Sequence, residues 1–278
     1  MGIIQRECSP KSVGAGIQIP PNSTLILKRW GFLSDVEAVS VHPRDLILRS
    51  YRDGSVLSKQ NLLPFTELEY SCPYLHLHRG AFHKILVEQA EMLGVEIKLG
   101  CMVVGIDFEE SAVLIHQQPE FRADIIVGAD GVRSVCREAL LGRPDPPLPT
   151  GDLAYRILVK AKDMREYPEL VDLVDNPALN FWMGPDAHAV CYLIGDMYNI
   201  VLLCPDTLPD LVNTAEADLQ EMRTVFRGWD PRLELLLGLV HETKKWRLQT
   251  SQEMANWSHP AGTFVLLGDA CHATLPYL

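Results

Sequence analysis

This sequence lacks the features that mark secreted, membrane-spanning or metal-binding proteins. No run of about 18 or more apolar residues occurs in it, which argues against a transmembrane helix. The segment Met1–Ser12 has no basic stretch followed by an apolar one, so no signal peptide is predicted. The 7 cysteines are scattered and form no CxxC pair, a pattern typical of reduced thiols in a cytoplasmic protein, and no metal site is predicted.

The sequence also lacks an excess of positive charge. Lys and Arg together number 25 against 36 Asp and Glu, which gives a formal net charge of −11. This balance argues against binding to nucleic acid or to an anionic membrane surface. With 47% hydrophobic and 22% charged residues the composition is that of a globular protein, and 278 residues allow one large domain or two ordinary ones.

A GxGxxG turn is absent, and the clearest local pattern is instead Ala123–Arg137 (ADIIVGADGVRSVCR). Ile125–Val127 is a short β-branched run that predicts a strand buried on both faces of a parallel sheet. Ser134 predicts the cap of a helix that continues to Leu140. Asp130 follows the strand on a glycine turn, where open α/β sheets bind ligands. A purely structural role, in which Asp130 only caps the helix, fits the spacing equally well.

Two further motifs accompany this one. Gly268–Pro276 (GDACHATLP) follows an apolar run, and Gly14–Ser23 (GAGIQIPPNS) is a glycine loop that leads into a strand and a helix. Together with Asp130-Gly131, these motifs resemble, in the same order, those of the flavoprotein aromatic hydroxylases. The Gly14–Ser23 loop is similar to that of the salicylate-hydroxylase-like branch. The resemblance extends over nearly the whole chain.

The resemblance implies FAD as cofactor and indicates the residues that bind it. In this family the residue at the position of Asp130 lies beside the cofactor pyrophosphate, and the carboxylate at the position of Asp269 accepts hydrogen bonds from ribityl hydroxyls. Gly14 and Ala15 correspond to the flavin-contacting loop. Arg79 precedes an amphipathic helix and corresponds to an arginine that reaches the flavin side of the cofactor; a solvated arginine is the alternative.

The sequence contains fewer of the residues expected to bind the adenosine and pyrophosphate end of the cofactor. The resemblance implies a chain that is truncated at both ends, without the first strand–GxGxxG–helix unit and without the glycine turn and long helix that follow the last motif. Gln5 falls at the position of the acidic residue that binds the adenosine ribose in the family, and Glu7 lies two residues away; the choice between them stays open. Arg133 or Arg137 is the expected cation near the pyrophosphate.

The order of predicted elements divides the chain into two kinds of structure. Arg143–Pro149 contains four prolines in seven residues and predicts a crossover between domains. The expected fold class is α/β: a Rossmann-like FAD/NAD(P)-binding domain that lacks its first β-α unit, with an inserted mixed-sheet α+β substrate domain. We expect residues 1–149 to form part of the FAD-binding domain, 150–242 the substrate domain, and 243–278 the return to the FAD-binding domain. The predicted helices include 208–226, 231–240, one capped by Asn22 or Ser23 and ended by Gly31, and one over 82–93.

Two residues of the second domain are candidates for contact with substrate. The family pattern directs attention to Arg156, on the first strand after the crossover, and to Tyr192, on a later strand. Arg156 can pair with a carboxylate or phenolate, and Tyr192 can hydrogen-bond a phenolic oxygen or transfer a proton. The alternative, that both are edge residues of the sheet, is given nearly equal weight.

The resemblance implies an FAD-dependent monooxygenase that hydroxylates a small aromatic substrate, salicylate-like, phenol-like or a secondary metabolite, with O2 and with NAD(P)H as co-substrate. One alternative is a truncated, catalytically inactive relative without stable FAD binding. Another is a flavoenzyme for epoxidation or halogenation, which is less favoured because a halogenase needs a lysine and a tunnel that we do not locate. The sequence does not define the aromatic substrate, the choice between NADH and NADPH, or the oligomeric state.

Overall fold

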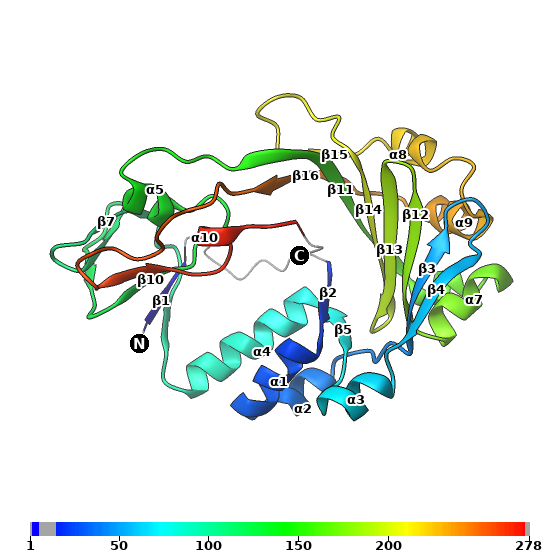
Figure 1. Ribbon diagram of the computed structural model, residues 1–278, viewed down its shortest axis with the longest axis horizontal. Coiled ribbons are helices and arrows are strands. Elements are labelled where there is room, and N and C mark those ends of the chain that lie inside the picture. Colours follow the sequence, from blue (N-terminus) through cyan, green and yellow to red (C-terminus); the bar gives the residue numbers. More distant parts are fainter. Residues whose placement is uncertain (1, 6–14, 276–278) are drawn as a thin grey trace. The chain divides into compact units, whose positions relative to one another are not determined.

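The computed structural model describes residues 2–5 and 15–275, and their contacts group them into two compact units (Figure 1). The first unit contains the described parts of 1–11 and 248–278 together with Ala90–Gly151. The second contains the described part of 12–89 together with Asp152–Arg247. Among the residues described, none of the helices combines the length and the apolar composition needed to cross a bilayer.

The first unit is built from short strands around a small core. β10 and β17 form one parallel pair, β1 and β6 form another, and β7, β8 and β9 form an antiparallel sheet. Ile126, Phe264 and Leu266 pack in its core with Cys136 of the following helix. The elements are β1 (Gly2–Ile4), β6 (Glu96–Lys98), β7 (Val103–Asp107), β8 (Ala112–Ile115), β9 (Phe121–Arg122), β10 (Ile126–Gly128), α5 (Val135–Leu141), β17 (Phe264–Leu266) and α10 (Asp269–His272).

The prediction that the strand at 125–127 is buried on both faces is wrong. Ile126 lies in the core, but Ile125 is 63% exposed and Val127 is 52% exposed. The reason is that, within the described part of the chain, β10 pairs only with β17 and packs on one face. The helix predicted after it is confirmed, because α5 follows Ser134, whose side chain accepts a hydrogen bond from the backbone N–H of Arg137 at 2.8 Å.

The second unit contains an eight-stranded sheet in the order β15-β16-β11-β14-β13-β12-β3-β4. β11, β14, β13 and β12 pair as antiparallel neighbours, and β3 runs parallel to β12, so the sheet is mixed as predicted. Its strands are β3 (Asp45–Ser50), β4 (Val56–Asn61), β11 (Leu148–Lys160), β12 (Ala178–Gly184), β13 (Ala187–Ile194), β14 (Met197–Pro205), β15 (Thr214–Glu216) and β16 (Lys244–Thr250).

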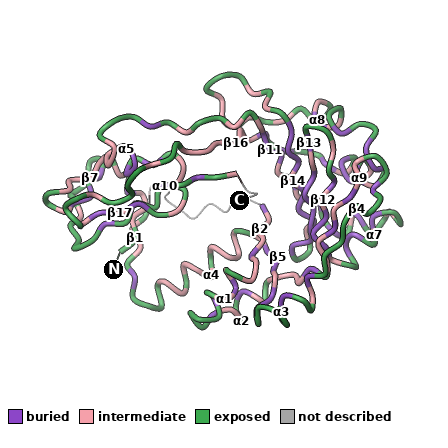
Figure 2. The backbone as a smooth tube through the Cα atoms, viewed as in Figure 1, coloured by how far each residue is buried: buried purple, intermediate pink, exposed green. Residues whose placement is uncertain are grey.

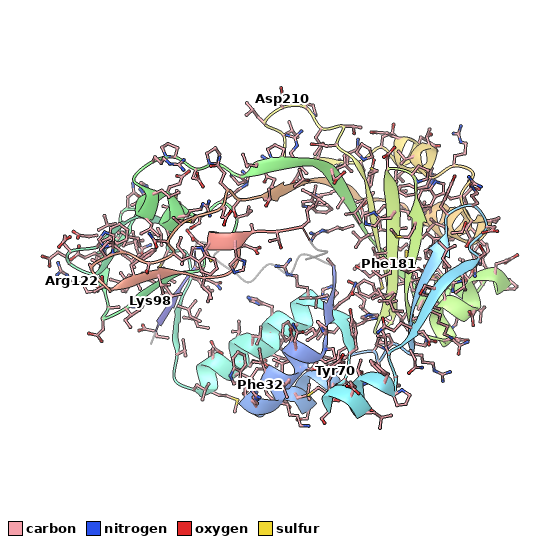
Figure 3. All side chains as sticks on the ribbon, viewed as in Figure 1. Phe32, Tyr70, Lys98, Arg122, Phe181 and Asp210 are labelled. Carbon is pink, nitrogen blue, oxygen red and sulfur yellow. The ribbon has the colours of Figure 1, made fainter. Side chains whose placement is uncertain are left out.

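One face of this sheet carries the largest core of the protein. Tyr155, Trp182 and Ile200 on the strands pack against Leu170 and Leu236 on covering helices, and all are nearly fully buried. Figure 1 shows α7, α8 and α9 beside this sheet, and Figure 2 colours much of its central strands as buried. The other face carries the alternate residues, among them Phe181, which is labelled in Figure 3. The helices on the core side are α6 (Ala161–Met164), α7 (Pro168–Asp175), α8 (Leu219–Val225) and α9 (Pro231–Gly238).

The grouping of the chain differs from the sequence-based division at residues 15–89. These residues were expected in the FAD-binding part, but their contacts place them with 152–247, because the β3–β4 hairpin extends the large sheet beside β12. A short sheet of β2 and β5 belongs to the same unit. The remaining elements are β2 (Gly16–Ile19), α1 (Pro21–Trp30), α2 (Leu33–Glu37), α3 (Phe65–Tyr70), β5 (Leu75–His78) and α4 (Arg79–Met92).

Two of the predicted helices begin at other residues than the sequence indicated. The single helix expected over 208–226 is wrong in its first half, where β15 pairs with β16 and α8 begins only after Asp218. The carboxylate of Asp218 accepts from the backbone N–H of Gln220 at 2.8 Å and so caps this later start. α1 begins at Pro21 rather than after Asn22 or Ser23, but it ends at Gly31 as predicted, with the glycine in the left-handed region.

Candidate functional site

The two turns that carry Asp130 and Asp269 begin side by side in the first unit. Gly128 in β10 is the register partner of Leu266 in the parallel strand β17. Asp130 and Asp269 follow these strands almost immediately. Because neighbouring parallel strands end at the same edge of a sheet, the structure brings these two predicted site residues to one edge, where ligands of α/β sheets bind.

Asp130 has the capping role that the sequence left open. Its Oδ1 accepts a hydrogen bond from the hydroxyl of Ser134, and its Oδ2 accepts one from the backbone N–H of Cys136 at 3.1 Å. Burial, and after it the nearby Asp130 carboxylate, raises the pKa of the Cys136 thiol to about 12, so the thiol is not a nucleophile. The Asp130 side chain is nevertheless exposed, and a carboxylate with about four acceptor positions can also bind a ligand.

Asp269 is in a different situation. It is exposed, and its carboxylate accepts no hydrogen bond from any residue that the structure describes. Gly268 before it has a positive φ of 61°, which glycine adopts without strain and which turns the chain directly after β17. The Asp269 carboxylate is therefore available to accept hydrogen bonds from hydroxyl groups of a ligand.

Arg137 is a structural residue. It is 1% exposed, and its guanidinium donates to Asp145 at 2.6 Å and to the backbone oxygens of Gln252 at 2.6 Å and Cys271 at 3.1 Å. These bonds use one donor on each of its three nitrogens, and burial keeps the guanidinium away from an external anionic ligand. Of the two arginines expected near a pyrophosphate, only the exposed Arg133 has a guanidinium that is largely free; it donates to the Gln249 side chain at 3.1 Å.

The residues expected to contact the flavin lie in the second unit where they are described. Ala15 is buried, and its backbone oxygen accepts from the backbone N–H of Arg79 at 2.9 Å, next to the pairing of β2 with β5. Gly14 and Glu7 lie outside the described residues. Gln5 is described, and its backbone hydrogen-bonds at the end of the β1–β6 pair, with no side-chain partner among the described residues.

Arg156 and Tyr192 lie on the same face of the large sheet. Arg156 is the register partner of Val201, which pairs in turn with Val190, two residues before Tyr192. The alternative that they are edge residues is wrong, because β11 and β13 are interior strands of the sheet. Burial lowers the pKa of Arg156, and the positive charge of Arg79 lowers it further. Burial raises the pKa of Tyr192, so its hydroxyl stays protonated at neutral pH.

A buried polar layer surrounds Tyr192, and sequence reasoning missed it. Gln18 lowers the pKa of the Tyr192 hydroxyl, against the larger effect of burial, and its side chain accepts a hydrogen bond from the hydroxyl of Tyr74 at 2.8 Å. His76 is fully buried; its ring centre lies 4.5 Å from that of Tyr192, and burial lowers its pKa to about 3. Within the described residues neither nitrogen of His76 has a hydrogen-bond partner, nor does Nδ2 of Asn199.

At Gly16 the β2–β5 sheet packs closely against this layer. The Gly16 N–H donates to Oδ1 of Asn199 at 2.8 Å, and an added Cβ would lie 2.7 Å from the Tyr192 ring. The alternation of Leu75–His78 is the sequence signal that could have indicated this layer. In the structure, His76 lies opposite Gln18 across β5 and β2. Nothing in the sequence indicated which side of that strand faces β13.

Comparison with known proteins agrees with this arrangement of motifs. A family model described as "FAD binding domain" matches residues 63–278. The FAD-dependent monooxygenase OpS4 of Beauveria bassiana (strain ARSEF 2860) is 42% identical over 273 residues, which cover 96% of this chain and 64% of that protein. The 6-hydroxynicotinate 3-monooxygenase of Pseudomonas fluorescens is 32% identical over 272 residues, covering 96% of this chain and 68% of that protein.

Solved structures show the same fold. The crystal structure of CtdE in complex with FAD and substrate 4 superposes with a TM-score of 0.84 over 98% of this chain and 69% of that one, at 19% identity. At this level of identity the likeness concerns the fold alone. This chain spans 64% of the length of OpS4, somewhat less than two thirds of that relative.

Proposed function

Because this chain belongs to the FAD-binding family of flavoprotein aromatic hydroxylases, we propose that the protein is an FAD-dependent monooxygenase that hydroxylates a small aromatic substrate with O2 and NAD(P)H. The observation that carries the proposal is the side-by-side start of the turns of Asp130 and Asp269 at the ends of two parallel strands. The proposed cofactor-binding residues lie in both units, and the proposed substrate-binding residues lie on the large sheet of the second.

The residues of the first unit have the chemistry that FAD requires. The unpartnered, exposed carboxylate of Asp269 is suited to accept hydrogen bonds from ribityl hydroxyls, with the added strength of a charged acceptor. Asp130 fixes the start of α5 and keeps acceptor capacity for a second group of the cofactor. The exposed Arg133 is the cation proposed to face the pyrophosphate.

The second unit is proposed to contribute to the flavin end and to hold the substrate. Ala15, Gly14 and Arg79 are the proposed flavin contacts. Bound FAD, reduced by NAD(P)H, would supply the chemistry that activates O2. The protein would bind and orient the aromatic ring and exclude water around it.

Arg156 and Tyr192 are the proposed substrate-binding residues. Neither Arg156 on β11 nor Arg79 at the start of α4 has a carboxylate partner among the described residues, and the positive charge of Arg79 acts on Arg156. A carboxylate or phenolate on the substrate would supply the missing negative charge and form charge-assisted hydrogen bonds with Arg156. The hydroxyl of Tyr192, whose pKa burial raises, would donate to a ring oxygen, or pass a proton to it.

Flavin retention is the first test. The 278-residue chain would be mixed with FAD and passed through gel filtration, and we expect the flavin absorbance to elute with the protein. A colourless protein would favour the alternative of a relative without stable FAD binding. Coloured protein would then be incubated with NADH or NADPH and a panel of hydroxylated aromatic carboxylates, and mass spectrometry would test for a product that has gained one oxygen atom.

Arg156→Gln tests the proposed substrate site. Loss of a charge-assisted hydrogen bond predicts a KM for an aromatic carboxylate that rises by at least about tenfold. Arg165→Gln is the matched control, because Arg165 is an exposed arginine whose ion pair with Asp175 lies on the helical side of the sheet. Oxidation of NAD(P)H without an oxygenated product from any member of the panel would overturn the proposed reaction.

A further inference from the structure

The half-buried Arg156 differs from Arg137 and Arg247 in how it is held. The guanidinium of Arg137 pairs with Asp145, and that of Arg247 pairs with Asp206. Arg156 is only partly exposed, yet within the described residues its guanidinium has neither a carboxylate partner nor a hydrogen bond. A desolvated cation without a charged partner is stabilised by contact with the face of an aromatic ring.

That contact is the ring of Trp246. The guanidinium carbon of Arg156 lies 5.8 Å from the centre of the Trp246 ring, within the range of cation–π attraction. The two strands that carry these residues, β11 and β16, are neighbours in the sheet. The hydroxyl of Thr243 also donates to the backbone oxygen of Arg156 at 3.0 Å and ties the start of β16 to β11.

The residues on either side of Trp246 fix its strand from the opposite face. Nζ of Lys245 lies 2.5 Å from the carboxylate of Glu221 on α8, and Arg247 pairs with Asp206, which follows β14. Since successive side chains of a strand point to opposite faces, these two ion pairs hold Trp246 on the face that carries Arg156. In Lys245-Trp246-Arg247, the tryptophan ring thus contacts Arg156, and the two flanking residues form ion pairs.

We infer that Trp246 is a positioning residue that holds Arg156 ready for a carboxylate-bearing aromatic substrate, an inference that rests on the proposed function. A carboxylate in place of Trp246 would neutralise Arg156 and consume its N–H donors. An aromatic face attracts the cation without accepting its N–H groups in the guanidinium plane, which leaves the planar donor fork for the ligand. The selectivity for a negatively charged substrate then depends on a residue that does not itself bind the charge.

The binding test compares two probe ligands, benzoate and its neutral analogue benzamide, by calorimetry on the full chain. Trp246→Leu is expected to weaken benzoate binding about tenfold and to leave benzamide binding unchanged. Trp246→Phe, which keeps an aromatic face, is expected to retain most of the benzoate affinity. Trp30→Leu is the control for loss of an exposed tryptophan in the same unit and should change neither. Equal weakening of both ligands in Trp246→Leu would indicate a packing role and overturn the inference.

A second measurement does not depend on any ligand. The Nε–H signal of Arg156, assigned by its absence in Arg156→Lys, should be shifted upfield by the Trp246 ring current in an NMR spectrum. We expect this shift to be lost in Trp246→Leu and kept in Trp246→Phe; an unchanged signal in Trp246→Leu would overturn the inference. Wild-type protein that shows the shift but binds neither ligand would overturn the proposed substrate class while supporting the contact.

Discussion

Gly128 and Leu266 face each other across the parallel pair of β10 and β17, and a Cβ added to Gly128 would lie 2.8 Å from Cδ2 of Leu266. The same Cβ would lie 2.8 Å from Cβ of Cys136 at the start of α5. Gly128 therefore permits the close packing of strand, strand and helix from which both acidic turns emerge. Its backbone oxygen also accepts from the N–H of Leu267 at 2.9 Å, just before the second turn.

Gly128→Ala should destabilise the protein through overpacking. The neighbouring contacts include a Cβ atom that cannot move without its helix, so we expect the free energy of unfolding to fall by about 1–3 kcal/mol. Urea denaturation would measure it. Gly105→Ala is the matched control, because Gly105 is also a strand glycine of the first unit, and its added Cβ would meet only Leu114 at 3.6 Å. Equal midpoints for the two variants would contradict this packing argument.

Asp269→Asn and Asp130→Asn should differ in their effects. Asp269 has no partner among the described residues, so its variant should lower FAD affinity by about tenfold without changing the urea midpoint. Asp130 also caps α5, so its variant should in addition lose about 1 kcal/mol of stability. FAD fluorescence titration and urea denaturation would separate the two quantities. Asp124→Asn, an exposed carboxylate before β10, controls for the change of charge; if it weakened FAD binding as much, a specific role for Asp269 would be refuted.

Arg137 and Arg143 both bind Asp145 but differ in burial. The side chain of Arg137 is 2% exposed and that of Arg143 is 56% exposed. Arg137→Met leaves the buried Asp145 carboxylate without its main partner and should cost about 3–5 kcal/mol of unfolding free energy. Arg143→Met removes a partner that water can replace and should cost less than about 1 kcal/mol. Thermal or urea unfolding of the two variants would test the difference, and similar losses would show that burial does not govern this network.

His76 should make stability dependent on pH. Burial lowers its pKa from 6.5 to about 3, so between these values the unfolded chain binds a proton that the folded protein does not. Stability from this group is therefore complete above pH 6.5 and is lost as the pH falls, by up to about 1.4 kcal/mol per pH unit. The slope of the unfolding free energy against pH reports the difference in bound protons between the unfolded and folded states. His76→Gln should reduce this difference by up to one proton between pH 6.5 and 5. An unaltered slope in His76→Gln would show that the imidazole is protonated in the fold.

Local patterns identified many individual elements of this protein. The end of α1 follows from Gly31. The helix after Asp130 follows from Ser134. These predictions succeed because turn and cap preferences depend on a few adjacent residues. The start of α8 was mispredicted because pairing of β15 with β16, a long-range contact, overrides the helical pattern before Asp218.

The chain's own sequence determined the family, the positions of its three motifs and the residues that carry ionisable groups, since these are properties of short segments and their order. Tertiary structure alone decided that Arg137 is a buried structural cation, that Ile125 and Val127 face solvent, and that His76 and Asn199 lie beside Tyr192. It also decided that Arg156 lies against Trp246, about ninety residues further along the chain. The physical reason is that burial, desolvation and pairing of a side chain depend on strands and helices distant in sequence, and no local pattern specifies which of them will become neighbours.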